Sequence, residues 1–499
     1  METQDWVMYA SEIKLSVQDV INGETVKCLG QDSIIKLSPR DGALLYRFPE
    51  GSRKSVDLAV SYAKQSFCNG CWSELPVQQR KTILNKLASL VEKNTEKFAL
   101  YECLDVGKPI TQAITDVGES ANILRSFAEG ADKVLLPSFA DGYNYQLRKP
   151  VGVVAAIIGW NFPLILAIQK LGSALAMGNS LVLKPSEFTS LSAGYLAELA
   201  VEAGVPPGVF NVVHGKGEIV GAALAHHPDV NLISFTGSSA TGKQIMRACA
   251  QSNMKRLMLE CGGKSPFIVF DDCPEDIDYL ASQIVFIAFQ NQGAWCVSGT
   301  RLLVHQDIKA KLLSKVIEKT AELTPGDPLN TETNFGALIN EEHLKKVLNY
   351  IASGKKEGAK LVQGGKRISC EVNNPDSEGF YLEPTIFDEV HPRQKIAQEE
   401  IFGPVLSVLT FNDEDEAIKI ANGTNYGLAA YVASVNIGRV QRMSKSLNAG
   451  FFMAIGSSNP LDRYVEIGLE GHRESGFGHE GGLMGLLSYT VGTSVHLFV

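Results

Sequence analysis

The sequence lacks a hydrophobic run long enough to span a bilayer, and it lacks a concentrated run of lysine and arginine. Its longest apolar run, residues 151–160, is about half the length of a membrane helix. The N-terminal segment METQDWVMYASEIKLS does not place an apolar stretch after a basic one, as a signal peptide would. A formal net charge of −9 argues against binding to nucleic acid phosphates. These absences predict a cytoplasmic protein that has neither a membrane nor a nucleic acid as partner.

The sequence also lacks the cysteine pattern of a disulfide framework or of a zinc site. Its nine cysteines are an odd number scattered along 499 residues, which favours reduced thiols. Cys68 and Cys71 form one C-x-x-C, but no second pair and no histidine cluster accompanies them. A structural role is favoured for this pair, and no metal ion is predicted.

What is present is an ordinary globular composition, with 45% hydrophobic and 20% charged residues. At this length the chain has more core than one domain usually holds, so two or three domains are expected. The first 130 residues are mainly helical in pattern, because two long stretches repeat apolar residues at intervals of three and four. No low-complexity linker or short repeat interrupts the chain.

From Val151 onward, short apolar runs alternate with helical segments, which predicts parallel strands joined by crossover helices. The segments KPSE (184–187), HGKG (214–217) and FTGS (235–238) each follow an apolar run. Ligands of such sheets bind beyond the carboxyl ends of the strands, where these segments should lie. A second alternating region covers about residues 266–448. The C-terminal tail is apolar and β-rich, so we expect it to pair with another strand, plausibly across a subunit interface.

Three polar side chains stand at positions that suit carbonyl chemistry. Cys296 follows a glycine-containing turn, although a lone cysteine is more often an apolar filler. Glu260 ends an apolar strand just before a pair of glycines, and Asn161 stands between Trp160 and Phe162. A thiol, a carboxylate and an amide can serve as nucleophile, base and oxyanion donor in the covalent oxidation of a carbonyl group.

With these residues in place, the chain closely resembles the aldehyde dehydrogenase superfamily over nearly its full length. Each motif alone is weak, but their number and order make coincidence untenable. The matching segments are LDVGKP (104–109), GWNFPL (159–164), KPSE, FTGS with Gly242 and Lys243, LECGGKSP (259–266), the Cys296 segment, EEIFGPV (399–405) and SGFGHEGG (475–482).

The resemblance implies an α/β fold with two doubly wound domains and a small β oligomerisation domain. It places the NAD-binding domain at residues 1–129 and 151–260, and the catalytic domain at 261–477. The oligomerisation domain would comprise 130–150 and 478–499, in a homodimer or a homotetramer. The implied roles are Cys296 as nucleophile, Glu260 as general base and Asn161 as oxyanion donor, together with the Cys296 backbone N–H. The expected partner is a small-molecule aldehyde.

The expected cofactor is NAD. Lys184 and Glu187 match the pair that binds the adenosine ribose, and the Glu187 carboxylate would repel the 2′-phosphate of NADP. The alternative is that KPSE only caps the following helix. The remaining expected cofactor residues are Trp160, Gly217, Phe235, Gly237, Ser238, Glu400 and Phe402. FTGS would approach the pyrophosphate and EEIFGPV the nicotinamide side, although EEIFGPV could also be a surface turn.

Some positions depart from the family pattern. Ala294 stands where the family usually has Gln or Glu, and Trp295 either narrows the substrate tunnel or is a core aromatic residue. GLEG (468–471) stands where the family has Pro-Phe-Gly-Gly. The loop before it, SSNPLDRYVEI, is about three residues longer than the family pattern. Enzymatic activity should survive, because Cys296, Glu260 and Asn161 are all present.

The substrate residues are expected to be Asp116, Glu119, Phe162 and Trp295. Asp116 and Glu119 are three apart on a helix, and two carboxylates at a tunnel mouth would favour a cationic tail. An ordinary solvated helix face is the alternative. SNMKR before LMLECGGKSP resembles bacterial enzymes of γ-glutamyl-aminobutyraldehyde, whereas Gln169 and Gln290 replace the aromatic cage of betaine aldehyde enzymes. We expect an amino or acylamino aldehyde as substrate. A non-catalytic scaffold or a coenzyme A-acylating enzyme are the rival functions.

Overall fold

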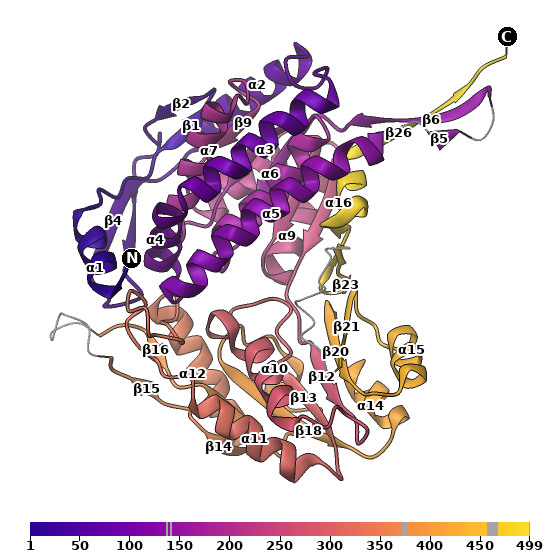
Figure 1. Ribbon diagram of the computed structural model, residues 1–499. Helices are drawn as coiled ribbons and strands as arrows, with labels where there is room; N and C mark the ends of the chain where they lie inside the picture. The colour runs from indigo at the N-terminus through magenta and orange to yellow at the C-terminus, as the bar shows by residue number, and fades with distance from the viewer. Residues whose placement is uncertain (136–137, 140–141, 371–377, 457–467, 499) are drawn as a thin grey trace.

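The computed structural model describes residues 1–135, 138–139, 142–370, 378–456 and 468–498. Its two α/β units lie one above the other in Figure 1, and a narrow three-stranded sheet extends from the upper unit. In the described ranges no helix is both long and apolar enough to cross a membrane.

The upper unit is built on an eight-stranded sheet with the order β2-β1-β9-β8-β7-β10-β11-β24. The five central strands pair in parallel, as the alternation of strands and helices predicts. They are β7 (Val153–Ile157), β8 (Ser180–Lys184), β9 (Phe210–Val212), β10 (Leu232–Thr236) and β11 (Arg256–Glu260). The antiparallel outer strands are β1 (Asp19–Ile21), β2 (Glu24–Val26) and β24 (Gly476–Phe477).

Helices cover both faces of this sheet because successive strand residues point to opposite faces. Val154 and Ala156 of β7 join one core cluster, whereas Val153 and Ala155 join another. The first face carries α3 (Val77–Lys93), α4 (Thr95–Val106), α5 (Ile110–Leu135), α6 (Pro163–Ala176) and α7 (Leu191–Ala203). The second carries α2 (Arg53–Cys68), α8 (Ala222–His226) and α9 (Ser239–Ala250).

The N-terminal region is less helical than its sequence pattern predicts. A short helix, α1 (Thr3–Glu12), is followed by β1, β2, β3 (Ser33–Leu37) and β4 (Leu44–Pro49) before the first long helix begins. The strands β1 and β2 are three residues each, too short to show a period of two. The expectation of a mainly helical start was therefore wrong for about the first fifty residues.

The lower unit contains a seven-stranded sheet with the order β14-β17-β18-β13-β12-β20-β21. Its strands are β12 (Pro266–Val269), β13 (Arg301–His305), β14 (Lys360–Gln363), β17 (Thr385–Asp388), β18 (Val405–Phe411), β20 (Ala429–Ala433) and β21 (Phe451–Ile455). Its main helices are α10 (Ile277–Phe289), α11 (Lys309–Ala321), α12 (Glu341–Lys356), α13 (Lys395–Gln398), α14 (Glu414–Ala421) and α15 (Ile437–Ser446). Two core clusters, one on each face, make this second α/β unit doubly wound as well.

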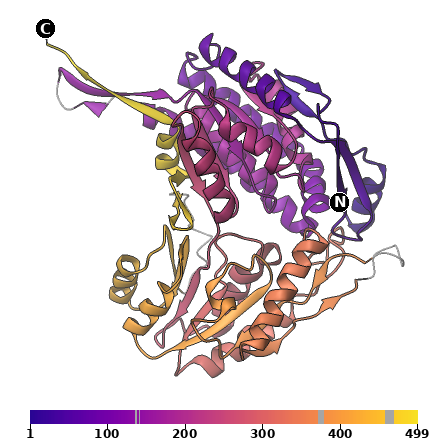
Figure 2. The same ribbon diagram turned by 180° about the vertical axis from the view of Figure 1, so that it is seen from behind.

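The C-terminal tail pairs with a strand of its own chain. β26 (Thr490–His496) runs antiparallel to β6 (Asn144–Pro150), which also pairs with β5 (Ser138–Phe139). Seen from behind, this sheet projects away from the rest of the molecule, with the C-terminus near its tip (Figure 2). The expected pairing is confirmed within the chain, and the pairing across a subunit interface stays a prediction.

Candidate active site

A cavity of about 870 Å³ brings most of the predicted site residues together. The turns after β7, β10 and β11 open into it, and α10 and the Cys296 segment of the lower unit complete it. Its walls include the predicted residues Glu119, Trp160, Asn161, Phe162, Gly237, Ser238, Glu260, Trp295, Cys296, Glu400 and Phe402. Some of the expected cofactor residues and most of the expected substrate residues thus line one continuous space.

The segment before Cys296 has an unusual backbone. Asn291, Gln292 and Gly293 follow α10 with φ angles of 49°, 54° and 72°. Left-handed conformations are unfavourable for residues other than glycine, so surrounding contacts must hold them. The Asn291 side chain supplies such contacts, because its Nδ2 donates to the carbonyl oxygens of Asn161 at 2.8 Å and Ala294 at 3.3 Å. The sequence analysis missed Asn291, whose partner lies 130 positions away.

Asn161 lies in the turn between β7 and α6, where its amide reaches the thiol segment. Its Nδ2 donates to the Ala294 carbonyl oxygen at 3.0 Å. A primary amide has two N–H donors, so one donor stays available for an oxyanion. Ala294 is buried and meets Asn161 through its backbone, so the unusual side chain at this position leaves the contact intact.

The thiol and the carboxyl group of the trio both sit in a desolvated, negatively charged environment. Burial raises the pKa of Cys296 to about 12, and the charges of Glu260 and Glu400 contribute. Burial also raises the pKa of Glu260 well above its usual range; the Glu480 charge adds to this shift and Lys170 opposes it. The Cys296 thiol is therefore protonated at neutral pH, and the environment of Glu260 favours its neutral form.

Beside Glu260 lies a buried ion pair that the sequence analysis did not predict. The Lys170 ammonium donates to the Glu480 carboxylate, and neither side chain is appreciably exposed. A lysine within the apolar helix α6 is a signal of a buried charge that needs a partner. Glu480 is 310 positions away, so the sequence does not reveal which residue that partner is.

The predicted ribose pair forms at the end of β8. Lys184 Nζ donates to Glu187 Oε2 at 2.9 Å. Burial acts to raise the pKa of Glu187, but Lys184 and the Gly217 backbone N–H outweigh it and lower the pKa. Glu187 does not cap the next helix, since α7 begins at Leu191 after Ser190. The structure thus assembles Lys184, Glu187 and Gly217, although none of the three lines the cavity itself.

The FTGS turn leads directly into α9. Ser238 is the N-cap residue of this helix, and its hydroxyl accepts from the Thr241 backbone N–H. Gly237 and Ser238 line the cavity next to the free N–H groups of the helix, a geometry that suits phosphate. Phe235 is buried in the core, and its ring lies 2.5 Å from where a Gly237 Cβ would be, so its expected role toward the cofactor stays a prediction.

The EEIFGPV segment is part of the cavity wall and not a surface turn. The Gly263 backbone N–H donates to Glu400 Oε1 at 3.1 Å, and a Cβ on Gly262 would lie 2.0 Å from Glu400 Oε2. Phe402 has a φ of 60°, and its ring centroid lies 5.3 Å from that of Trp160. His343, which the sequence analysis missed, bonds through Nε2 to the Phe402 carbonyl oxygen at 2.8 Å.

Only one of the two carboxylates predicted to meet the substrate lines the cavity. Glu119 on α5 lines it, whereas Asp116 does not. Asp116 is buried and accepts a hydrogen bond from Lys108 Nζ at 2.6 Å, so its charge is neutralised inside the protein. The prediction that Asp116 faces the substrate was wrong, because a buried lysine lies on that side of the helix.

Aromatic and amide side chains also line the cavity. Trp295 lines the cavity and also packs against the core of the upper unit, with its ring centroid 6.4 Å from that of Phe162. Trp295 therefore packs as a core aromatic residue, and its role in narrowing the substrate tunnel stays a prediction. Gln169 and Gln290 line the same space, as does Gly468 of the GLEG segment. The loop SSNPLDRYVEI (457–467) lies outside the described residues.

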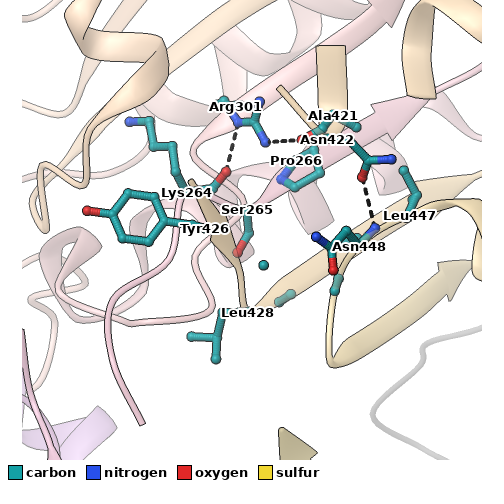
Figure 3. A pocket seen from close by; sticks show the side chains of 14 residues that line it. Lys264, Ser265, Pro266, Arg301, Ala421, Asn422, Tyr426, Leu428, Leu447 and Asn448 are labelled. Carbon is teal, nitrogen blue, oxygen red and sulfur yellow. Dashed lines mark hydrogen bonds between the residues drawn. The ribbon is translucent and has the colours of Figure 1, made fainter. Parts of the chain in front are cut away.

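A second pocket, of about 10 Å³, lies between β12, β20 and α14 (Figure 3). Arg301 lines this pocket and donates hydrogen bonds to the carbonyl oxygens of Lys264 and Ala421, each at 2.7 Å. A space of this size holds no more than about one water molecule. Aldehyde chemistry therefore belongs to the larger cavity.

Comparison with known proteins agrees with this geometry. The family model "Aldehyde dehydrogenase family" matches residues 28–495, so the chain belongs to the aldehyde dehydrogenase family. The NADP/NAD-dependent aldehyde dehydrogenase PuuC of Escherichia coli is 40% identical over 490 residues, covering 97% of this chain and 96% of that protein. The predicted family, enzyme class and fold class are confirmed.

Two solved structures each cover 100% of both chains with a TM-score of 0.94 and 42% identity. One is the indole-3-acetaldehyde dehydrogenase of P. syringae in complex with NAD+ and IAA. The other is the γ-glutamyl-γ-aminobutyraldehyde dehydrogenase of Burkholderia cenocepacia J2315. The NAD+ bound to the first of these relatives agrees with the predicted cofactor.

Proposed function

We propose that the protein oxidises an amino or acylamino aldehyde to the carboxylic acid, with NAD as hydride acceptor. The observation that carries this proposal is the convergence of Cys296, Glu260 and Asn161 on one cavity that Glu119 also lines. Nucleophile, base and oxyanion donor are the groups that covalent aldehyde oxidation needs.

The residues of the cavity fit NAD. Lys184 and Glu187 would hold the adenosine ribose, Gly237 and Ser238 the pyrophosphate, and Glu400 the second ribose. Gly262 fits this assignment, because any larger residue would displace the Glu400 carboxylate. The bound cofactor supplies a positively charged ring that accepts hydride from the substrate carbon. A Glu187 carboxylate beside the ribose would disfavour the 2′-phosphate of NADP.

The reaction begins when the Cys296 sulfur, as thiolate, bonds to the aldehyde carbon. The carbonyl oxygen becomes an oxyanion, which accepts hydrogen bonds from Asn161 Nδ2 and from the Cys296 backbone N–H. After hydride has left the same carbon, a thioester to Cys296 remains. Glu260, in its carboxylate form, then takes a proton from water while the hydroxyl oxygen attacks the thioester carbon. The carbon–sulfur bond breaks, which releases the acid and restores the thiolate.

The substrate tail would lie between Glu119 and the amides of Gln169 and Gln290. Glu119 can attract an ammonium group, and the amides can hydrogen-bond to an acylamino group. Aromatic walls around the amides exclude water along the alkyl part of such a substrate. The name of the solved relative from Burkholderia supports an acylamino aldehyde of this kind.

A second candidate is an aromatic aldehyde. Phe162, Phe286 and Trp295 all line the cavity, and stacked rings favour an aromatic substrate. The solved P. syringae relative is an indole-3-acetaldehyde dehydrogenase. Glu119 favours the aminoaldehyde, because a carboxylate at the cavity gains nothing from a neutral indole ring.

An aldehyde panel tests the proposal. NADH formation would be measured with 4-aminobutyraldehyde, its γ-glutamyl derivative, indole-3-acetaldehyde and hexanal, each with and without coenzyme A. We expect the highest kcat/KM for the first or second substrate and no dependence on coenzyme A. Cys296→Ala should form no NADH. Preference for hexanal or the indole would contradict the substrate proposal, dependence on coenzyme A would indicate the acylating enzyme, and no NADH would indicate a scaffold.

We also expect a homodimer or a homotetramer. The sheet of β5, β6 and β26 projects from the chain and leaves a β26 edge beside exposed side chains such as Phe498 and Tyr143. Covering this edge with a second copy would satisfy its backbone groups. Light scattering after gel filtration measures the mass directly, and truncation before Thr490 should yield a smaller species.

A further inference from the structure

Three metal-binding side chains meet in the upper unit, away from the cavity. Asp19 begins β1, Cys28 follows β2, and His214 follows β9. The strand β1 pairs with both β2 and β9, and this pairing brings the three residues together. They are 0%, 4% and 1% exposed, and their ligand atoms all lie within 4.8 Å of one another.

Two buried polar atoms of this cluster lack a hydrogen-bond partner and point to a cation-binding role. His214 Nε2 lies 3.1 Å from the Ser190 carbonyl oxygen, which can only accept, so Nε2 carries a proton. The other ring nitrogen, Nδ1, lies 3.5 Å from Asp19 Oδ1, which also accepts the His214 backbone N–H at 2.8 Å. Among the described residues, neither His214 Nδ1 nor Asp19 Oδ2 has a hydrogen-bond partner, although both side chains are buried. Such an arrangement is costly unless a cation lies between the two groups.

We propose that Asp19, Cys28 and His214 supply three of the ligands of a zinc site. Cysteine, histidine and carboxylate are the usual protein ligands of Zn²⁺, at bond lengths of about 2.0–2.3 Å that put ligand atoms about 3.3–3.7 Å apart in a tetrahedron. Cys28 Sγ lies 3.4 Å from Asp19 Oδ1, within that interval. A ligating histidine characteristically donates its other ring N–H to a backbone carbonyl or a carboxylate, as His214 does to Ser190.

The charge balance also fits a fully buried ion. On binding, the Cys28 S–H bond breaks, its proton leaves to solvent, and a zinc–sulfur bond forms without oxidation or reduction. The dication, one thiolate and one carboxylate then sum to zero with a neutral imidazole. A neutral unit avoids the large cost of burying an uncompensated charge. Without metal, burial and the Asp19 carboxylate raise the pKa of the Cys28 thiol and keep it protonated.

The ion would fasten the hairpin of β1 and β2 to the edge of the cofactor-binding sheet. His214 directly precedes Gly215, and the Glu187 partner Gly217 is three positions further on. Structural zinc ions contribute folding free energy because the site does not exist in the unfolded chain. No short sequence spacing reveals this site, because its ligands are spread over positions 19, 28 and 214.

The metal content of the full-length protein tests the proposal. Untagged protein is produced in minimal medium with Zn²⁺ or with Co²⁺ and purified without chelator. Its metal content is then measured by inductively coupled plasma mass spectrometry. The background carries Cys68→Ser and Cys71→Ser, which removes the exposed cysteine pair. We expect one zinc ion per chain, and its loss in Cys28→Ser and in His214→Gln. Cys249→Ser, which changes a buried thiol outside the cluster, should keep the metal.

The cobalt-grown protein provides a second measurement that needs no folded variant. A thiolate-to-cobalt charge-transfer band with tetrahedral visible bands is expected in the parent protein. Absence of both zinc and cobalt from the parent, or metal retention in a folded Cys28→Ser variant, would overturn the proposal. Because NADH formation is assayed separately, failure of the zinc site would leave the proposed oxidation standing.

Discussion

Lys108 donates a hydrogen bond to Asp116 at 2.6 Å, and both side chains are buried. The same ammonium lies 3.5 Å from Glu102 and 4.4 Å from the centroid of the Phe162 ring. The pair therefore supports the cavity wall from behind, while Glu119, on the same helix, faces the cavity. Two carboxylates three residues apart thus have different roles.

Asp116→Asn should destabilise the protein without changing its substrate preference. Removing one partner of a buried ion pair costs about 3–5 kcal/mol, and Glu102 should offset part of that loss. We expect a melting temperature lower by several degrees and an unchanged ratio of kcat/KM between aminoaldehyde and hexanal. Calorimetry and steady-state kinetics measure the two quantities. A changed ratio at unchanged stability would show that Asp116 contacts the substrate after all.

Glu119→Gln should have the opposite effects to Asp116→Asn: a changed substrate preference and an unchanged stability. The side chain is exposed at the cavity, so its loss should leave the melting temperature nearly unchanged. We expect kcat/KM for 4-aminobutyraldehyde to fall about five- to tenfold, the effect of about one charge interaction at a partly solvated site. The value for hexanal should stay within about twofold of the wild type. Equal losses for both substrates would argue against a role in recognising a cationic tail.

Glu480→Gln should move the acidic limb of the pH profile. Glu260 works as a base only when deprotonated, so activity falls as pH drops through its pKa. The Glu480 charge raises the pKa of Glu260, and the Lys170 charge lowers it. Removing the Glu480 charge should therefore bring the Glu260 pKa down toward its ordinary value. We expect the acidic limb of kcat to shift by about one unit to lower pH.

A control for this shift is Glu470→Gln, because the Glu470 charge acts on Glu260 in the same direction but more weakly than that of Glu480. The acidic limb of the pH profile of Glu470→Gln should move less than that of Glu480→Gln. Kinetics must be measured well below the melting temperature, since Lys170 loses its partner in Glu480→Gln. A limb that stays in place or moves to higher pH would contradict the electrostatic coupling.

Gly262→Ala should impair cofactor binding through Glu400. A Cβ at this position would lie 2.0 Å from Glu400 Oε2 and 2.5 Å from its Cδ, so the carboxylate must move. We expect the KM for NAD to rise about tenfold, the loss of about one charge-assisted hydrogen bond. Gly118→Ala is the control, because no atom lies within 4 Å of its added Cβ. An unchanged KM in Gly262→Ala would exclude Glu400 as a ribose ligand.

Much of the fold was predictable because the buried parallel strands are continuous apolar runs, and the polar turns after them mark the ligand-binding edge. The order of the motifs also predicted Cys296, Glu260 and Asn161, which the structure brings to one cavity. These features depend on local sequence. Ala294 departs from the family pattern, but its backbone carbonyl oxygen still accepts the hydrogen bond from Asn161 Nδ2. This contact does not depend on the side chain at position 294.

The rest depended on partners distant in sequence. Helical spacing placed Asp116 near Glu119 but could not show that Lys108, which precedes the helix, occupies the inner side. The partner of Lys170 is likewise 310 positions away. Phe235 sits in a motif shared with Gly237, and only the sheet geometry shows that its side chain points into the core. Pairing of this kind is set by tertiary packing, which a single sequence does not encode at short range.

Alkylation of the free enzyme tests the state of the nucleophile. A thiol with its pKa raised to about 12 is protonated at pH 7, and only the thiolate reacts with iodoacetamide. The labelling rate of Cys296 should therefore rise about tenfold for each pH unit and continue rising without a plateau up to pH ~10. Peptide mass spectrometry follows Cys296 separately from the exposed Cys68 and Cys71, and Cys296→Ala identifies its peptide. A plateau below pH ~8 would mean that the thiolate forms without bound cofactor, because the thiol would then have a pKa nearer to that of an activated cysteine.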